Sequence, residues 1–121
     1  MGNVNYELMA ATTIDADKSS NPLLADRLQG VSFHCVITGS PIGELKLQCS
    51  NDAGTIPEAG EHAATDISNW ADVGDASLAV NGAGSYVLST TDQFVRWMRL
   101  AYVSTSGTGS MVVRVGGRTV R

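Results

Sequence analysis

The stretch VSFHCVITGSPIGELKLQCS, residues 31–50, decides the fold class of this chain. From Val31 to Thr38, apolar and polar side chains alternate with a period of two, and the same alternation returns from Glu44 to Ser50. This period is typical of a β-strand with one buried and one solvated face. The intervening GSPIG contains the glycine and proline of a tight turn. The pattern therefore predicts an antiparallel hairpin over residues 31–50.

The predicted hairpin sorts its side chains onto two faces. The expected buried face carries Val31, Phe33, Cys35, Ile37, Leu45, Leu47 and Cys49. The expected solvated face carries Ser32, His34, Val36, Thr38, Glu44, Lys46, Gln48 and Ser50. The two cysteines thus fall on adjacent strands of the buried face. Because no export signal is apparent, two reduced, buried thiols are favoured over a disulfide.

Further strand patterns lie on both sides of this stretch. They are YELMAATTI (6–14), ISNWADV (67–73), ASLAV (76–80), SYVLS (85–89), QFVRWMRLAYVS (93–104) and SMVVRVGG (110–117). The last two runs flank a TSGTG turn and predict a closing hairpin, and NGAG at 81–84 predicts a turn with glycines available for positive φ. PLLADRLQG at 22–30 is interpreted as one or two helical turns. About eight short strands predict an all-β fold, an antiparallel β-sandwich of jelly-roll type.

The length and composition of the chain limit the number of domains that it can form. With 121 residues and 12.7 kDa, it is long enough to bury one core, so we expect a single domain over residues 1–121. Hydrophobic residues make up 43% and charged residues 17%, which is typical of a folded protein. Neither a signal peptide nor an apolar span of about 20 residues is apparent. We therefore expect a soluble protein made in a cytosol, with no membrane partner.

The segment NDAGTIPEAGEHAATD, residues 51–66, contains four acids, no lysine or arginine, and several turn formers. It is interpreted as a long surface loop, and loops of this length in compact domains are usually functional or mobile. A long loop and the free chain ends can reach neighbouring molecules without disturbing a sheet. The candidate interface residues are therefore Glu58, Glu61, His62, Arg118 and Arg121.

The formal net charge of −4 is unevenly distributed along the chain. Residues 1–93 carry three basic and twelve acidic side chains, whereas residues 94–121 carry five arginines and no acid. This asymmetry indicates either an interacting surface or charge balance within the sheets. Arg96 and Arg99 lie on an apolar strand pattern, where arginine is expected to pair with a carboxylate or extend to an edge. The acidic net charge disfavours nucleic acid as a partner.

No pattern in the sequence predicts catalysis. There is no GxSxG nucleophile motif and no CxxC, and the two histidines lie apart, His34 on a solvated strand face and His62 in the acidic segment. The glycine-rich GAGS at 82–85 and SGTGS at 106–110 join strands, whereas a phosphate-binding loop leads into a helix. We expect no enzymatic activity, no catalytic residues, no cofactor and no metal site.

Residues 31–121 resemble small β-sandwich structural proteins of bacteriophage virions. The resemblance rests on GELKLQCSNDAG (43–54), the later NWADV (69–73) and FVRWMRLAYVSTSGTGSMVVRV (94–115). It implies a non-enzymatic virion structural protein, a capsid decoration or minor capsid component made in the host cytoplasm. The implied partners are further copies of the chain, in a homo-oligomer, and other virion proteins.

The same segments also resemble discoidin-type, galactose-binding-like modules, in which a Ser-Asn-Asp turn and a tryptophan lie close together. This chain departs from that pattern because the acidic segment separates Asp52 from Trp70. The resemblance implies an alternative function, a tail or adsorption-apparatus component that binds a host glycan. In that case Trp70, Tyr86 and Tyr102 are expected to stand exposed near a cluster of loops.

Overall fold

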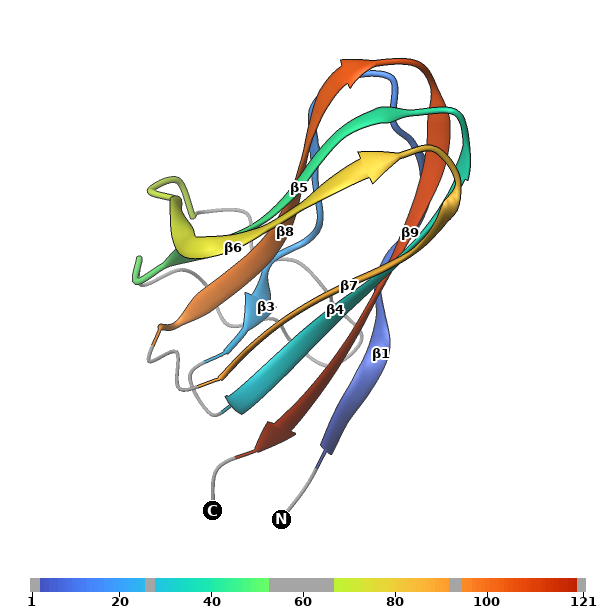
Figure 1. The fold of residues 1–121 in the computed structure, drawn as a ribbon. Helices are drawn as coiled ribbons and strands as arrows, with labels where there is room; N and C mark the ends of the chain where they lie inside the picture. The colour runs from blue at the N-terminus through green and yellow to red at the C-terminus, as the bar shows by residue number, and fades with distance from the viewer. Residues whose placement is uncertain (1–2, 26–27, 53–66, 92–94, 120–121) are drawn as a thin grey trace.

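The computed structural model describes residues 3–25, 28–52, 67–91 and 95–119 (Figure 1). These residues form nine β-strands and no helix. The strands are β1 (Asn3–Thr13), β2 (Lys18–Ser19), β3 (Leu23–Leu24), β4 (Leu28–Gly39), β5 (Ile42–Ser50), β6 (Ala71–Asn81), β7 (Gly84–Thr91), β8 (Trp97–Ser106) and β9 (Gly109–Thr119). Accordingly, the described part of the chain contains no helix that could span a bilayer.

The strands form two antiparallel sheets that pack face to face. One sheet has the order β1-β9-β4-β7, and the other has the order β2-β8-β5-β6, with β3 also paired to β8. All of the strand pairs are antiparallel. The prediction of an all-β antiparallel sandwich is therefore confirmed.

The two sheets are the halves of one longer antiparallel sheet that bends over on itself. β4 pairs with β9 up to Gly39↔Gly109, and beyond the bend β5 pairs with β8 from Ile42↔Ser106. In the same way, β7 pairs with β4 on one side of the bend and β6 pairs with β5 on the other. On the opposite flank, β1 pairs with β9 and β2 pairs with β8. Figure 1 shows these passes of the chain turning over at one end of the molecule. Strands that switch sheets through such bends form the corners of β-sandwiches.

Backbone hydrogen bonds join the four bends in a row. Each bend donates to or accepts from its neighbour, through Ile14 N–H to Gly109 C=O at 2.9 Å, Ser40 N–H to Thr108 C=O at 3.1 Å and Gly82 N–H to Pro41 C=O at 2.9 Å. These bonds satisfy backbone groups that would otherwise be left without partners where the ladders stop. The row of bends is therefore a continuous structural element, which we call the corner.

Both predicted hairpins are wrong. The strands within residues 31–50 belong to different sheets and do not pair with each other, and the same holds for β8 and β9 around TSGTG. The turn predictions at these positions and at residues 81–84 are correct, but each turn crosses from one sheet to the other. Glycine and proline suit a hairpin turn and a corner equally, so local sequence does not distinguish the two.

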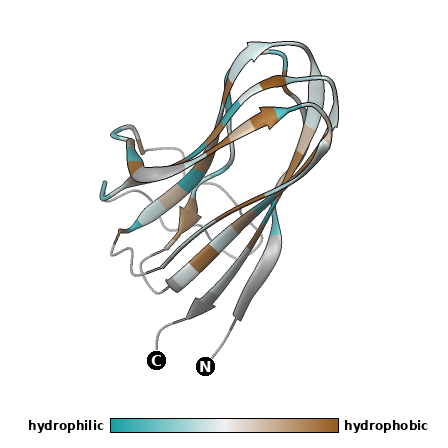
Figure 2. Cartoon of the chain, viewed as in Figure 1, coloured by the Kyte–Doolittle hydropathy of each residue, from teal (hydrophilic) through white to brown (hydrophobic). Residues whose placement is uncertain are grey.

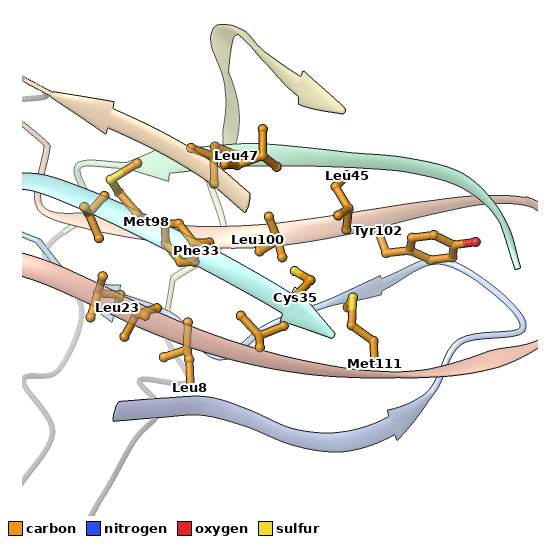
Figure 3. Close-up of a cluster of buried hydrophobic side chains, with 14 of the residues drawn as sticks. Leu8, Leu23, Phe33, Cys35, Leu45, Leu47, Met98, Leu100, Tyr102 and Met111 are labelled. Carbon is orange, nitrogen blue, oxygen red and sulfur yellow. The ribbon is translucent and has the colours of Figure 1, made fainter. Parts of the chain in front are cut away.

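The predicted buried faces lie opposite each other across the sandwich. Phe33 and Cys35 of β4 project toward Leu45 of β5 and Leu100 of β8 in the core (Figure 3), and all four are at most 1% exposed. Along β4, brown and paler residues alternate (Figure 2), as the period of two predicts. The two strands that the sequence placed in one hairpin thus contribute to the core from opposite sheets.

The alternation fails at the end of β5. Ser50, expected on the solvated face, is 4% exposed, and Cys49 is only half-buried. β5 itself stays in register with β8 as far as Ser50↔Trp97, whereas the β5·β6 register shifts between Lys46 and Gln48 because extra residues lie in β6. Both cysteines are free, as expected, but only Cys35 is fully buried, and they lie in different sheets.

Two further predictions about elements are wrong. The expected helical turns at 22–30 are instead the short strand β3 followed by the start of β4, because Leu23 and Leu24 pair with β8 and Leu23 is buried. The two strands expected within 67–80 are one strand, β6, which begins after Trp70. In both places tertiary pairing overrides a weak local signal.

Candidate functional site

Asp52 organises the end of the sandwich opposite the corner. Its Oδ2 accepts hydrogen bonds from the backbone N–H groups of Ser68 at 2.9 Å and Asn69 at 3.0 Å. Its Oδ1 accepts a third from the Asn69 side-chain amide at 3.1 Å. The Asp52 N–H donates to the buried Ser50 hydroxyl at 3.1 Å. We call these four residues the Asp52 clamp.

The clamp closes the base of the acidic segment. Residues 52 and 68 are 16 positions apart in sequence, yet the carboxylate holds them at hydrogen-bond distance. A third chain segment joins them, because Trp97 Nε1–H donates to the Asp52 carbonyl at 3.1 Å and Arg96 N–H donates to Asn51 Oδ1 at 2.9 Å. The two ends of the insertion are therefore fixed to the sheet by described residues alone.

A row of polar side chains crosses β8, β5 and β6 next to the clamp. The Arg99 guanidinium lies 4.3 Å from the Trp70 ring centroid, and its Nε donates to Gln48 Oε1 at 2.8 Å. Gln48 Nε2 in turn donates to Asp72 Oδ1 at 3.1 Å. Lys46 Nζ lies 3.5 Å from Asp72 Oδ2. Arg99 was expected to pair with a carboxylate or to extend to an edge, and among the described residues it connects to the Asp72 carboxylate through the Gln48 amide.

The electrostatics of this surface follow from its hydrogen bonds. Donation from Asn69 and Ser68 lowers the pKa of Asp52, and donation from Gln48, with the charge of Lys46, lowers the pKa of Asp72. Burial raises the pKa of Cys35 to about 12 and also raises the pKa of Cys49. The carboxylates are thus ionised and engaged in structure at neutral pH, and both thiols are protonated, which makes them weak nucleophiles.

Four of the five predicted interface residues lie outside the part of the chain that the structure describes. Glu58, Glu61, His62 and Arg121 lie outside the described residues, and the Arg118 side chain is likewise undescribed. The Arg118 backbone is part of β9 and is in register with Asn3 of β1. The beginning of β1 and the end of β9 therefore lie side by side (Figure 1), at the end of the sandwich that faces away from the corner.

The aromatic residues do not form the exposed cluster that glycan binding was expected to require. Tyr102 is 1% exposed and belongs to the core (Figure 3). Tyr86 is half-buried, and its hydroxyl donates to the Gly82 carbonyl at the corner. Trp70 alone lies at the clamp end, with the Arg99 guanidinium on its ring. The three side chains are distributed over different parts of the sandwich.

The residues that build this surface were mostly missed by sequence reasoning. The SND triplet before the acidic segment was the available signal, since Ser, Asn and Asp side chains commonly hydrogen-bond nearby backbone groups. Nothing local predicted that Asp52 would bind residues 68 and 69. Among the described residues, no group of three or more His, Cys, Asp or Glu side chains is arranged to hold a metal ion. His34 lies half-buried on β4, in the other sheet.

Comparison with known proteins identifies a similar fold. No family model and no curated protein sequence matches the chain. The crystal structure of SPBc2 prophage-derived protein YomS matches 95% of this chain and 93% of that one, with a TM-score of 0.52 and 11% identity. The crystal structure of PirA covers 96% of this chain and 93% of that one, with a TM-score of 0.46 and 14% identity.

The chain shares its fold with a prophage-derived protein. Because the sequence identity is only 11%, the likeness shows a shared arrangement of strands and nothing further. The likeness extends over nearly the whole of both chains. None of these findings shows the resemblance to discoidin-type modules.

Replacing Asp52 with alanine is expected to lower Tm by a few degrees at neutral pH, because Ser68, Asn69 and their backbone amides lose an ionised acceptor. Since the folded pKa of Asp52 is depressed, its contribution is present above the unfolded value of about 3.8 and is lost as the pH falls through the folded pKa. Thermal unfolding of both proteins from pH 7 down to about pH 3 tests this.

The exposed Asp15 supplies a matched control, Asp15→Ala, which removes a carboxylate outside the clamp. Its Tm at neutral pH is expected to stay close to that of the wild type. A Tm difference between wild type and Asp52→Ala that is unchanged at the acidic end would contradict the role assigned to the ionised carboxylate.

Proposed function

We propose that this chain is a non-enzymatic structural protein of a bacteriophage virion, a capsid decoration or minor capsid component that assembles with copies of itself and with other virion proteins. The observation that carries the proposal is the fold shared with a prophage-derived protein over nearly the full length of both chains. The resemblance of residues 31–121 to virion β-sandwich proteins supports the same function. A place in the tail or adsorption apparatus is a variant of this proposal.

The geometry of the described residues suits an assembly role. The corner and the core give a rigid sandwich, and the Asp52 clamp anchors the acidic insertion on it. The beginning of β1 and the end of β9 lie beside each other at the same end of the sheets as the clamp. The anchors of the acidic segment and the described ends of β1 and β9 thus lie at one end of the sandwich, where contacts with neighbours need not disturb the sheets.

We do not extend the proposal to glycan binding. Exposed aromatic rings are the platform that such sites require, and the buried Tyr102 and the half-buried Tyr86 are engaged within the sandwich. Trp70 has Arg99 stacked on it. These placements are those expected of a structural protein.

Co-sedimentation tests the proposed function directly. The purified chain is expected to associate in solution and to sediment with virions that lack it, and a labelled chain is expected in intact particles. Protein that stays monomeric at high concentration and does not sediment with virions would overturn the proposal.

Deleting residues 55–64 is expected to leave Tm nearly unchanged but to weaken assembly. The fold should persist because the Asp52 clamp holds both ends of the insertion on the sheet. Assembly should weaken because the deletion removes Glu58, Glu61 and His62. Thermal unfolding and virion co-sedimentation measure the two effects separately.

The matched control replaces residues 55–64 with ten alternating glycines and serines, which keeps the chain length and removes the side chains. This variant should behave like the deletion in assembly if side chains of the segment make the contacts. Unchanged assembly in both variants would refute an interface in this segment.

A further inference from the structure

The folded-over sheet ends in four strands at its outer sides, and the two-residue strand β3 shares the side of β2 because it also pairs with β8. β1 and β7 are the outer strands of one sheet, and β2 and β6 are the outer strands of the other. Within the described residues, β7 pairs with β4 alone. The opposite side of β7 therefore presents a row of backbone N–H and C=O groups, which is the usual template for pairing with another strand.

Three of the outer strands carry features that discourage such pairing. The β1 ladder shifts register twice and includes Glu7. The β6 ladder also shifts register, and β6 carries Asp72. β2 is only two residues long and includes Lys18. Irregular ladders, charges and shortness are the features by which β-proteins protect their edges.

β7 has none of these features. Its sequence, GSYVLSTT, contains no charged residue and no proline. Its ladder with β4 runs from Gly30↔Thr91 to Ile37↔Gly84 without a register shift. Figure 1 shows β7 lying along the outer side of β4. It is therefore a regular, uncharged strand of eight residues at an open edge.

The outward face of β7 has an apolar centre. Val87 is 56% exposed, the largest value among the exposed large hydrophobic residues whose burial the structure describes, and Ser85 and Ser89 flank it on the same face. On the adjacent strand, Val36 is 38% exposed. The inward residue Leu88 is 8% exposed and packs in the core, so β7 is held firmly by its own sheet.

We propose that β7 pairs antiparallel with β7 of a second copy of this chain, with Val87 facing Val87 across a two-fold axis. The inference rests on the assembly role proposed above and names its contact. A two-fold axis brings the same strand of each copy together, and antiparallel pairing of a strand with itself satisfies this symmetry. The pairing joins two four-stranded sheets into one continuous sheet.

The absence of charge on β7 suits a second copy of this chain as the partner at this edge. The chain carries a net charge of −4, so two copies repel each other unless they meet where charge is absent. The strand β7 offers such a surface along its whole length. Burying Val87 against its counterpart adds an apolar contact at the centre of the pairing.

Val87→Lys tests the pairing, with sedimentation equilibrium of the full chain as the measurement. The wild type is expected to form dimers, and the variant should dimerise at least about tenfold more weakly, because two lysines would face each other across the axis. Its Tm should stay near that of the wild type, since Val87 is mostly exposed. Ser77→Lys, at an exposed position on β6, is the matched control and should dimerise normally.

Cysteine cross-linking tests the register. Directly opposed residues of antiparallel strands lie within reach of a disulfide, so Val87→Cys should give a covalent dimer on mild oxidation. Ser77→Cys and the wild type, which retains Cys35 and Cys49, should not. A wild type that is monomeric at every concentration, or a Val87→Lys variant that dimerises like the wild type, would overturn the inference.

Two combinations of results distinguish a failure of the β7 pairing from a failure of the proposed virion function. A monomeric chain that still sediments with virions overturns the β7 pairing and leaves the virion role standing. A β7-dependent dimer that does not sediment with virions supports the pairing and overturns the virion role.

Discussion

Gly107→Ala is expected to prevent the chain from reaching its native fold. Gly107 has a φ of +79°, and a Cβ there would collide with the backbone carbonyl oxygen of Ser40 across the corner. The carbonyl cannot move aside cheaply, because the neighbouring Ser40 N–H is bonded to Thr108. We expect a loss of more than about 4 kcal/mol, a large part of the stability of an ordinary domain. Circular dichroism and urea unfolding measure it.

Gly82→Ala is the matched control for this substitution. Gly82 also has a positive φ, +92°, but a Cβ there meets no atom within 4 Å. The control therefore isolates the backbone strain, which is about 1–2 kcal/mol for a residue with a Cβ in the left-handed region. Equal losses in the two variants would show that the close approach of chains at the corner has no energetic consequence.

Trp97→Ala is expected to destabilise the protein by about 3–5 kcal/mol, the usual consequence of truncating a buried tryptophan. Trp97 is 0% exposed and is the first residue of the central strand β8. The change also removes the donor that holds the Asp52 carbonyl. At roughly 4 °C per kcal/mol, Tm should fall by about 10–20 °C in differential scanning calorimetry.

Trp97→Phe separates packing from hydrogen bonding at this site. Phenylalanine keeps most of the ring volume but lacks the Nε1–H donor, so we expect a loss of about 1–2 kcal/mol. The role assigned to the buried indole would be contradicted if the alanine and phenylalanine variants unfolded at the same temperature.

The sequence predicted the faces of the strands well but not their partners. The period of two in residues 31–38 and 44–47 identified the buried side chains correctly, because burial alternates along any strand with one wet face. It could not show that the two strands face each other across the core. That depends on pairing with residues 97–119, more than forty positions away.

For the candidate site, too, the sequence indicated local features, and only the structure showed the contacts between distant residues. Ser-Asn-Asp before an acidic insertion indicated a turn, and the polar faces of the strands placed Gln48 outward. The bonds from Asp52 to Ser68 and Asn69 and the Trp70–Arg99 stack each join residues separated by 16 positions or more. Such contacts have no local signature, because each partner alone is an ordinary polar or aromatic residue.

By itself, the sequence determined the β-class of this protein, the buried faces of residues 31–38 and 44–47, and the positions of three of the four turns at the corner. Only the tertiary structure decided that those turns bend four long strands at one corner, and that β7 is the uncharged edge. The physical reason is that hydrophobic periodicity and turn chemistry act within a few residues. Strand pairing is set instead by which distant ladders can close over one core with their backbone groups satisfied.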